Sequence, residues 1–138
     1  MATNDILNSI PSRMTSGEIV QYIYSQKITG NYINALKNYS HYNDVVLSAW
    51  LNLNVKTYRT YKESSSTLNA NLQEHVIMLL SLLKHGIDIF GTSEDFYKWL
   101  ETPNFQFSGK GPFDFLGTIN GIKMVDDSLT GIEYGDNS

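Results

Sequence analysis

The sequence contains no cysteine, which excludes disulfide bonds and metal sites built from thiolates. Long hydrophobic runs are also missing, because the longest one, over residues 76–83, is interrupted by Ser81 and is too short to cross a bilayer. The first residues have neither the basic start nor the apolar core of a signal peptide. With 138 residues, we expect a soluble cytoplasmic protein that forms one domain, or two small subdomains around a shared core.

An excess of positive charge is absent as well. The formal net charge is -4, which argues against a protein that grips nucleic acid with its whole surface. Residues 1–93 hold seven Lys/Arg and six Asp/Glu, whereas residues 94–138 hold three and eight. The acidic C-terminal end suits a basic protein partner better than a phosphate backbone, although charge alone leaves a plain solvated surface open.

Signatures of catalysis and of cofactor binding are missing from the chain. None of the motifs GxxxxGK(S/T), GxGxxG and GxSxG occurs. The three histidines, His41, His75 and His85, fit no spacing typical of metal ligands. A Gly-Lys-Gly turn at residues 109–111 precedes Pro112, which lacks the N–H that a phosphate cradle needs. We therefore predict a protein without catalytic residues, bound metal or cofactor.

The apolar residues recur at helical spacing, and no segment alternates as a strand would. A capping box at residues 15–18 predicts a helix that ends near residue 27, and a second helix follows Gly30. A long helix comes next in the pattern and ends at Gly91. Residues 1–15 leave two possibilities open, a short helix or a loose segment.

Beyond Gly91, aromatic residues sit in short segments that glycine and proline punctuate. Several short helices and one terminal helix account for this pattern. We predict an all-α fold with a helix-turn-helix-like N-terminal bundle, a long central helix and a C-terminal module of short helices. Residues 1–67 form the first region and residues 68–138 the second, in which the module covers about 87–138.

Two short helices, over about 46–51 and 55–62, flank a tight turn at residues 53–54, which is the spacing of a helix-turn-helix within residues 43–63. The second helix presents the candidate DNA-contacting side chains: Lys56, Thr57, Arg59, Thr60 and Lys62. Three cations imply few phosphate contacts, and therefore weak, salt-sensitive binding unless a dimer doubles them. The alternative is a helix pair that only packs within the protein.

A set of residues in the C-terminal third follows a recognisable order. It comprises Phe90-Gly91, Trp99-Leu100, Pro103-Asn104, Gly109 to Pro112, Phe113 to Leu116, Thr118, Gly121, Val125, Leu129 and Ile132-Glu133-Tyr134-Gly135. At this spacing the set resembles the C-terminal toxin-binding domain of the Xre/MbcA/ParS antitoxins. Leu53 to Thr57 resembles the start of the second helix in the family's helix-turn-helix, but Thr60 stands where many members carry arginine.

The resemblance implies a bacterial, dimeric antitoxin that binds a toxin carrying a RES domain. Such toxins are similar to ADP-ribosyltransferases and consume NAD, so the antitoxin would neutralise its partner by covering the active site, without catalysis of its own. The resemblance also implies repression of the antitoxin's own operon through the helix-turn-helix. Two other functions stay open: a stand-alone helix-turn-helix repressor whose C-terminal module serves dimerisation, and a structural or polar-localisation adaptor.

The C-terminal module holds more aromatic residues than its core needs, and interfaces rely on a few aromatic anchors within a polar rim. Helix positions such as Phe96 and Trp99 are assigned to the core. The candidate toxin-contacting residues lie on a loop and at the chain end: Phe105, Phe107, Glu133, Tyr134, Gly135 and Asp136. The two acidic residues would engage cations that hold a phosphate-bearing cofactor in the toxin. Alternatively, residues 132–135 only cap the last helix.

Overall fold

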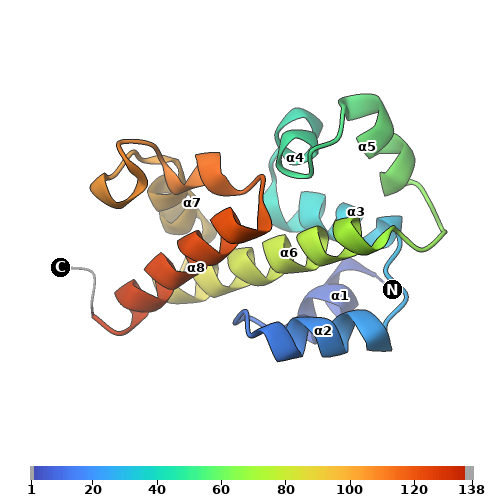
Figure 1. Ribbon diagram of the computed structural model, residues 1–138, viewed down its shortest axis with the longest axis horizontal. Helices are drawn as coiled ribbons and strands as arrows, with labels where there is room; N and C mark the ends of the chain where they lie inside the picture. Colours follow the sequence, from blue (N-terminus) through green and yellow to red (C-terminus); the bar gives the residue numbers. More distant parts are fainter. Residues whose placement is uncertain (1, 136–138) are drawn as a thin grey trace.

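The computed structural model describes residues 2–135, which form eight α-helices and two short 3-10 helices (Figure 1). No strand occurs among these residues, so the predicted all-α class is confirmed. One long helix lies at the centre, and the others pack around it in two groups, one from each half of the chain.

The central helix is α6 (Ala70–Phe90), about 32 Å long at 1.5 Å per residue. Its middle is apolar on every side, and residues 75–83 are all buried. The Asn69 side chain caps its first turn by accepting a hydrogen bond from the Leu72 N–H at 3.0 Å. Gly91, at φ 85°, ends the helix where the sequence predicts. A helix buried on every side needs neighbours on every side, and the remaining elements supply them.

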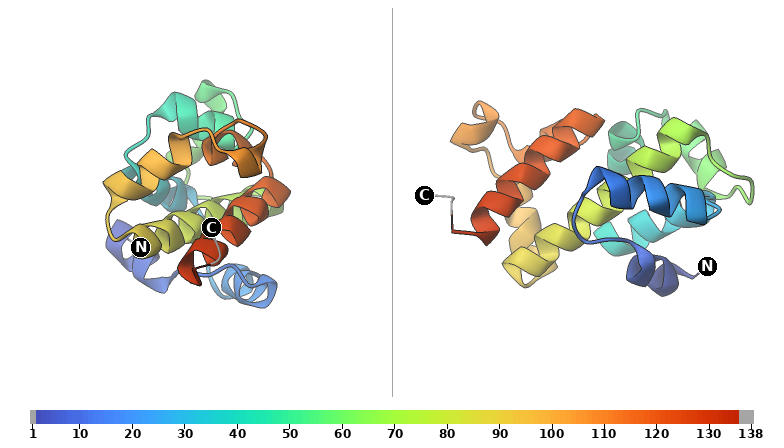
Figure 2. Two further views of the ribbon diagram at one scale, coloured as in Figure 1. Left: turned by 90° about the vertical axis from the view of Figure 1, so that its left-hand side faces the viewer. Right: turned by 60° about the horizontal axis from the view of Figure 1, so that its bottom comes forward.

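The N-terminal half contributes five helices: α1 (Thr3–Ser9), α2 (Ser16–Ser25), α3 (Gly30–Ser40), α4 (Asp44–Trp50) and α5 (Val55–Lys62). Helices α2 and α3 pack on α6, and α1 packs on α3 (Figure 2). The first residues adopt the short helix rather than a loose segment, because Ile6 and Ile10 are buried in the core. Helices α4 and α5 have the predicted helix-turn-helix spacing, and the side chains of Asn43 and Asn54 cap their first turns.

The C-terminal half adds α7 (Ser93–Glu101), the 3-10 helices η1 (Phe105–Phe107) and η2 (Pro112–Phe115), and α8 (Ile119–Glu133). Helix α8 runs beside α6 in the same direction (Figure 1). Two contacts fix this register, each between residues 41 positions apart. His75 Nε2 lies 3.0 Å from the Leu116 carbonyl oxygen, and His85 Nδ1 lies 2.7 Å from Asp126 Oδ1. Because α6 and α8 run in the same direction, the chain must return from the end of α6 to the start of α8. The segment with α7, η1 and η2 makes this connection.

An aromatic cluster joins the two halves. Tyr42 packs edge-on against three rings, with centroid distances of 5.1 Å to Trp50, 5.2 Å to Tyr97 and 5.5 Å to Phe113. Its hydroxyl donates a hydrogen bond to Glu101 Oε2 at 2.6 Å. The buried apolar residues of both halves form one continuous cluster. The two predicted regions therefore share a core, and a domain boundary between them stays a prediction.

The apolar length of α6 is explained by its neighbours in this fold, because α2, α3, α7 and α8 all pack on it. Among residues 2–135, no single helix is long and apolar enough to cross a membrane. Only α6 and α7 taken together reach that length and composition, and a bend of 110° separates them.

Two buried histidines on α6 have opposite electrostatic surroundings. His85 lies between two carboxylates of α8, with Asp126 at Nδ1 and Glu133 Oε1 3.2 Å from Nε2. The hydrogen bond with Asp126 raises the pKa of His85 against the opposing effect of burial, and Glu133 adds to the rise. His75 has the Leu116 carbonyl as its hydrogen-bond partner, and burial lowers its pKa. The charged imidazolium is thus favoured at His85 and disfavoured at His75.

Gly86 lets α7 approach α6, which generates a stability prediction. A Cβ atom at this position would lie 2.1 Å from Cε1 of Phe96, whose ring is fully buried. Gly86→Ala should therefore destabilise the protein by about 2–3 kcal/mol through overpacking, measured by urea denaturation. The matched control is Gly17→Ala in α2, where a Cβ meets nothing within 4 Å and a gain of up to about 1 kcal/mol is expected. If the two variants unfolded at the same midpoint concentration of urea, this account would be contradicted.

The two histidines predict opposite pH profiles of stability. Because the pKa of His85 is raised on folding, its stabilising contribution is complete below the ordinary value of 6.5 and is lost as the pH rises through the folded pKa. The melting temperature of wild type should thus exceed that of His85→Gln by a few degrees at mildly acid pH, and by less at alkaline pH. For His75→Gln the difference should be complete above pH 6.5 and shrink as the pH falls through the folded pKa, because the pKa of His75 is lowered on folding. Parallel profiles for the two variants would refute these assignments.

Candidate functional site

An open groove lies between α7, η1 and the end of α8. It is lined by Phe90, Trp99, Thr102, Asn104, Phe105, Gln106 and Ile132. Phe90 and Trp99 are half-buried and pack on each other with ring centroids 5.7 Å apart, so apolar surface lies open in the groove. Phe105 beside them is 96 % exposed. Contiguous exposed apolar surface of this kind, rimmed by polar residues, marks a place where another molecule binds.

The 3-10 helix η1 is a rigid projection rather than a loose loop. The Asn104 side chain accepts a hydrogen bond from the Gln106 N–H at 2.9 Å, and its carbonyl accepts one from the Gly109 N–H at 3.2 Å. Gly109 turns the chain back at φ 80°, a conformation that glycine adopts without strain. The Gln106 side chain also accepts from Ser128 Oγ at 2.7 Å, which ties η1 to α8. Hydrogen bonds therefore hold the backbone that carries Phe105, and its side chain projects outward.

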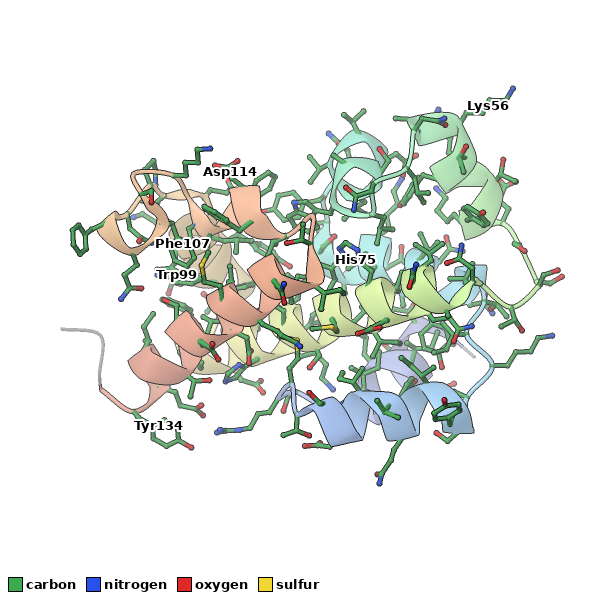
Figure 3. All side chains as sticks on the ribbon, viewed as in Figure 1. Lys56, His75, Trp99, Phe107, Asp114 and Tyr134 are labelled. Atoms are coloured by element: carbon green, nitrogen blue, oxygen red, sulfur yellow. The ribbon has the colours of Figure 1, made fainter. Side chains whose placement is uncertain are left out.

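Phe107 lies in the core, whereas the sequence predicts it at an exposed contact site. Its side chain is 2 % exposed and packs on Trp99 and Phe115, with ring centroids 6.4 Å and 5.4 Å away. Figure 3 shows Phe107 close to Trp99. The reason for the difference is the three-residue turn of the 3-10 helix, in which the directions of side chains two positions apart differ by about 120°. When the side chain of Phe105 is exposed, that of Phe107 therefore faces the core, and its packing there anchors η1.

Trp99 departs from the sequence expectation in the opposite sense. The sequence assigns it to the core, yet it is half-buried and lines the groove. Phe96 and Leu100 are the buried residues of α7, and Trp99 lies at the edge of the face that they share. Phe90 ends α6 and Ile132 belongs to the last turn of α8, and sequence reasoning placed neither of them in a site. Their position at helix ends, where apolar side chains are only partly buried, is the signal that would have found them.

The end of α8 carries the remaining predicted toxin-contacting residues. Tyr134 is 70 % exposed, and Gly135 follows it at φ 75°. Glu133 is already engaged within the chain, because Oε1 faces His85 Nε2 at 3.2 Å and Oε2 pairs with Arg13. Asp136 lies outside the described residues. Ile132 lines the groove and, together with Glu133, an adjoining hollow, so the surface of the groove continues to Glu133.

Asp44, the first residue of α4, is the electrostatic centre of the helix-turn-helix. Its carboxylate lies 2.6 Å from Lys37 Nζ of α3, 3.1 Å from Arg59 Nε and 3.5 Å from Lys62 Nζ of α5. The hydrogen bond from Lys37, joined by the charges of Arg59 and Lys62, holds the pKa of Asp44 well below its ordinary range. These three cations fix α3, α4 and α5 against one another.

The five predicted DNA-contacting residues are therefore not equally available. Lys56 is exposed and makes no ion pair within the part of the chain that the structure describes. Arg59 and Lys62 are both held by the same carboxylate, with 59 % and 16 % of their side chains exposed. Thr57 is half-buried, and Thr60 Oγ1 donates to the Lys56 carbonyl oxygen at 3.1 Å. The outward face of α5 offers less free positive charge than the sequence indicates.

The groove and the helix-turn-helix lie at opposite ends of the molecule. Figure 3 shows Lys56 at one end and Tyr134 at the other, with α6 between them. Trp99 lies on the same side of the molecule as Tyr134 in this view. The two candidate surfaces are therefore separate from each other.

Comparison with known families points to the same part of the chain. Residues 85–135 match the family model described as the antitoxin Xre/MbcA/ParS C-terminal toxin-binding domain. No curated protein matches the chain. The matched segment begins at His85 in α6, contains every residue that lines the groove, and ends at Gly135 after α8. Over residues 85–135, this chain is therefore similar to the C-terminal toxin-binding domain of the Xre/MbcA/ParS antitoxins.

Proposed function

We propose that this protein is an antitoxin that binds a RES-domain, NAD-consuming toxin and neutralises it by covering the toxin's active site. The observation that carries the proposal is the groove within residues 85–135, with Phe105 exposed beside it. The match to a toxin-binding domain supports a toxin as the partner. The RES class rests on the resemblance of the C-terminal motifs, and a neutralising antitoxin needs no catalytic residue of its own.

An exposed phenylalanine on a rigid support has the properties of an interface anchor. Burial of the Phe105 ring in a partner gains about 1.5–3 kcal/mol. Little entropy opposes this gain, because hydrogen bonds already fix the backbone of η1. Phe90 and Trp99 next to it add the aromatic surface that the centres of interfaces favour. The proposed contact is therefore an apolar centre with Phe105 at its middle.

Acidic side chains lie next to this apolar centre on one side. Asp88 and Glu133 line a hollow that adjoins the groove through Ile132. Residues 94–138 as a whole hold eight acidic and three basic residues. A cleft that binds NAD presents cations to the phosphates of the cofactor. We propose that Glu133 and the acidic residues near it face those cations, with Asp136, beyond the described residues, as a further member.

We also propose that a homodimer represses its own operon through α5. The specific observation is the helix-turn-helix spacing of α4 and α5, together with Lys56, which projects from α5 (Figure 3). Because Asp44 engages Arg59 and Lys62, each copy makes few phosphate contacts, and two copies are needed for useful affinity. A stand-alone repressor, the competing function, would bind its operator DNA and retain no toxin.

Phe105→Ala tests the proposed contact. Loss of an anchor of this size should weaken toxin binding by at least about tenfold, which corresponds to about 1.4 kcal/mol. Binding to the RES-domain protein encoded by the neighbouring gene is measured by calorimetry, and neutralisation by the residual NAD consumption of that protein. Tyr24→Ala is the matched control, because Tyr24 is 87 % exposed but lies on α2. Equal affinities of the two variants would remove Phe105 from the contact.

Lys56→Gln tests the proposed DNA contact. Loss of one phosphate contact should reduce the slope of log affinity against log salt by about one for each copy that binds. The measurement is a salt series of fluorescence anisotropy titrations with promoter DNA. Lys110→Gln is the control, because Lys110 is exposed in the C-terminal module and has the same charge. A slope that Lys56→Gln leaves unchanged would exclude α5 from the DNA interface.

A further inference from the structure

Arg13 joins the N-terminal part of the chain to the end of α8. It lies between α1 and α2, outside the matched residues 85–135. Its Nη1 donates to the Tyr134 hydroxyl at 3.2 Å, and its guanidinium carbon lies 5.9 Å from the centre of the Tyr134 ring. Its Nη2 pairs with Glu133. A planar guanidinium that stacks on a ring and makes two directed contacts fixes the orientation of its partners as well as their charge.

The backbone that carries Arg13 is fixed on both sides. Before it, Ile10 is 2 % exposed, and its carbonyl oxygen accepts a hydrogen bond from Lys84 Nζ at 2.7 Å. After it, the Thr15 side chain caps α2 by accepting from the Glu18 N–H at 3.2 Å. Arg13 therefore reaches α8 from a rigid support, and its contacts restrain the end of α8 relative to the core.

Helix α8 lacks such a restraint of its own. Its last turn contains no basic residue, so no cation from the helix itself faces the carbonyl dipoles at its C-terminal end. Two backbone hydrogen bonds close the C-terminal end of the helix. The Tyr134 N–H donates to the Thr130 carbonyl and the Gly135 N–H to the Ile132 carbonyl, both at 3.1 Å. Arg13 adds a positive charge there from the other end of the sequence, beside His85, which faces Glu133 from α6. Without Arg13, this turn opens more often.

The restrained turn forms one side of the proposed binding surface. Ile132 lines the groove beside Phe105, and it also lines the adjoining hollow with Glu133 and Asp88. When the last turn of α8 opens, this side of the surface is lost. When the binding surface is complete in only a fraction of the molecules, the apparent affinity equals the intrinsic affinity multiplied by that fraction.

We infer that Arg13 is a positioning residue for toxin binding, which holds the end of α8, with Glu133 and Tyr134, in the arrangement that the toxin recognises. The inference rests on the proposed toxin-binding function, and it extends the functional unit beyond the family domain to the segment between α1 and α2. The two charged side chains of the ion pair are 49 % and 27 % exposed, so the pair adds little to overall stability and acts locally.

Arg13→Gln tests this inference, with Arg59→Gln as the control. Arg59 is an arginine of similar exposure that pairs with Asp44 in the helix-turn-helix. In R13Q, hydrogen exchange of the amides over residues 130–134 should become about three- to tenfold faster, and in R59Q it should stay as in wild type. Affinity for the RES-domain protein of the neighbouring gene should fall in R13Q only, and by a smaller factor, because exchange follows the open fraction of the turn while affinity follows the closed fraction. Arg13→Lys should restore part of both effects, because it keeps the charge and loses the stacked plane.

Three results would overturn the inference. Faster exchange with unchanged affinity would make the Arg13 contact merely structural. Weaker binding with unchanged exchange would place Arg13 in direct contact with the toxin. Tighter binding by R13Q would show that Arg13 competes with the toxin for Glu133. If the wild-type protein itself does not bind the RES-domain protein, the proposed function fails, and the inference falls with it.

Discussion

The burial of α6 on every side is the constraint on which the rest of the fold depends. Nine consecutive residues, 75–83, are buried, so cover must arrive from several directions at once. The N-terminal helices cover one side, and α8 covers another by running parallel to α6. The crossover that makes this parallel arrangement possible does not enclose the end of α6. Phe90 therefore stays half-buried, and the groove exists because of how α6 is covered.

The helix boundaries could be predicted from the sequence because local chemistry determines them. Asn54 caps α5 and Gly91 ends α6 through groups within a few residues of each terminus. The direction of a side chain outside a long helix depends on more distant contacts. Phe105 and Phe107 have the same surroundings in sequence, yet the 3-10 turn and the packing on Trp99 separate them into an exposed anchor and a core residue. Packing between elements, which a single sequence does not display, decided that difference.

The number of charged residues in a segment of this sequence does not show how many of them are available to a partner. Three cations near α5 look like a DNA-binding face, but Asp44 engages two of them from the preceding helix. Glu133 looks like a free acidic end, but it holds Arg13, which is 120 positions away, and His85. Local patterns predict which residues share a helix face, whereas the partner of each charge follows only from the folded arrangement. The sequence thus predicts the segments of both candidate surfaces, and the structure shows which of their charged side chains are engaged within the chain.

The parallel register of α6 and α8 has a consequence for protein engineering. The family match begins at His85, but the chain that leads into α8 is anchored ten residues earlier, where the Leu116 carbonyl meets His75. The smallest portable unit is therefore longer than the matched segment and must include the whole of α6. Because α2 and α3 cover the opposite side of that helix, a graft into another scaffold must replace them with a new apolar layer. A transplanted segment that contained only the matched residues 85–135 would lack most of α6, the helix on which α8 packs.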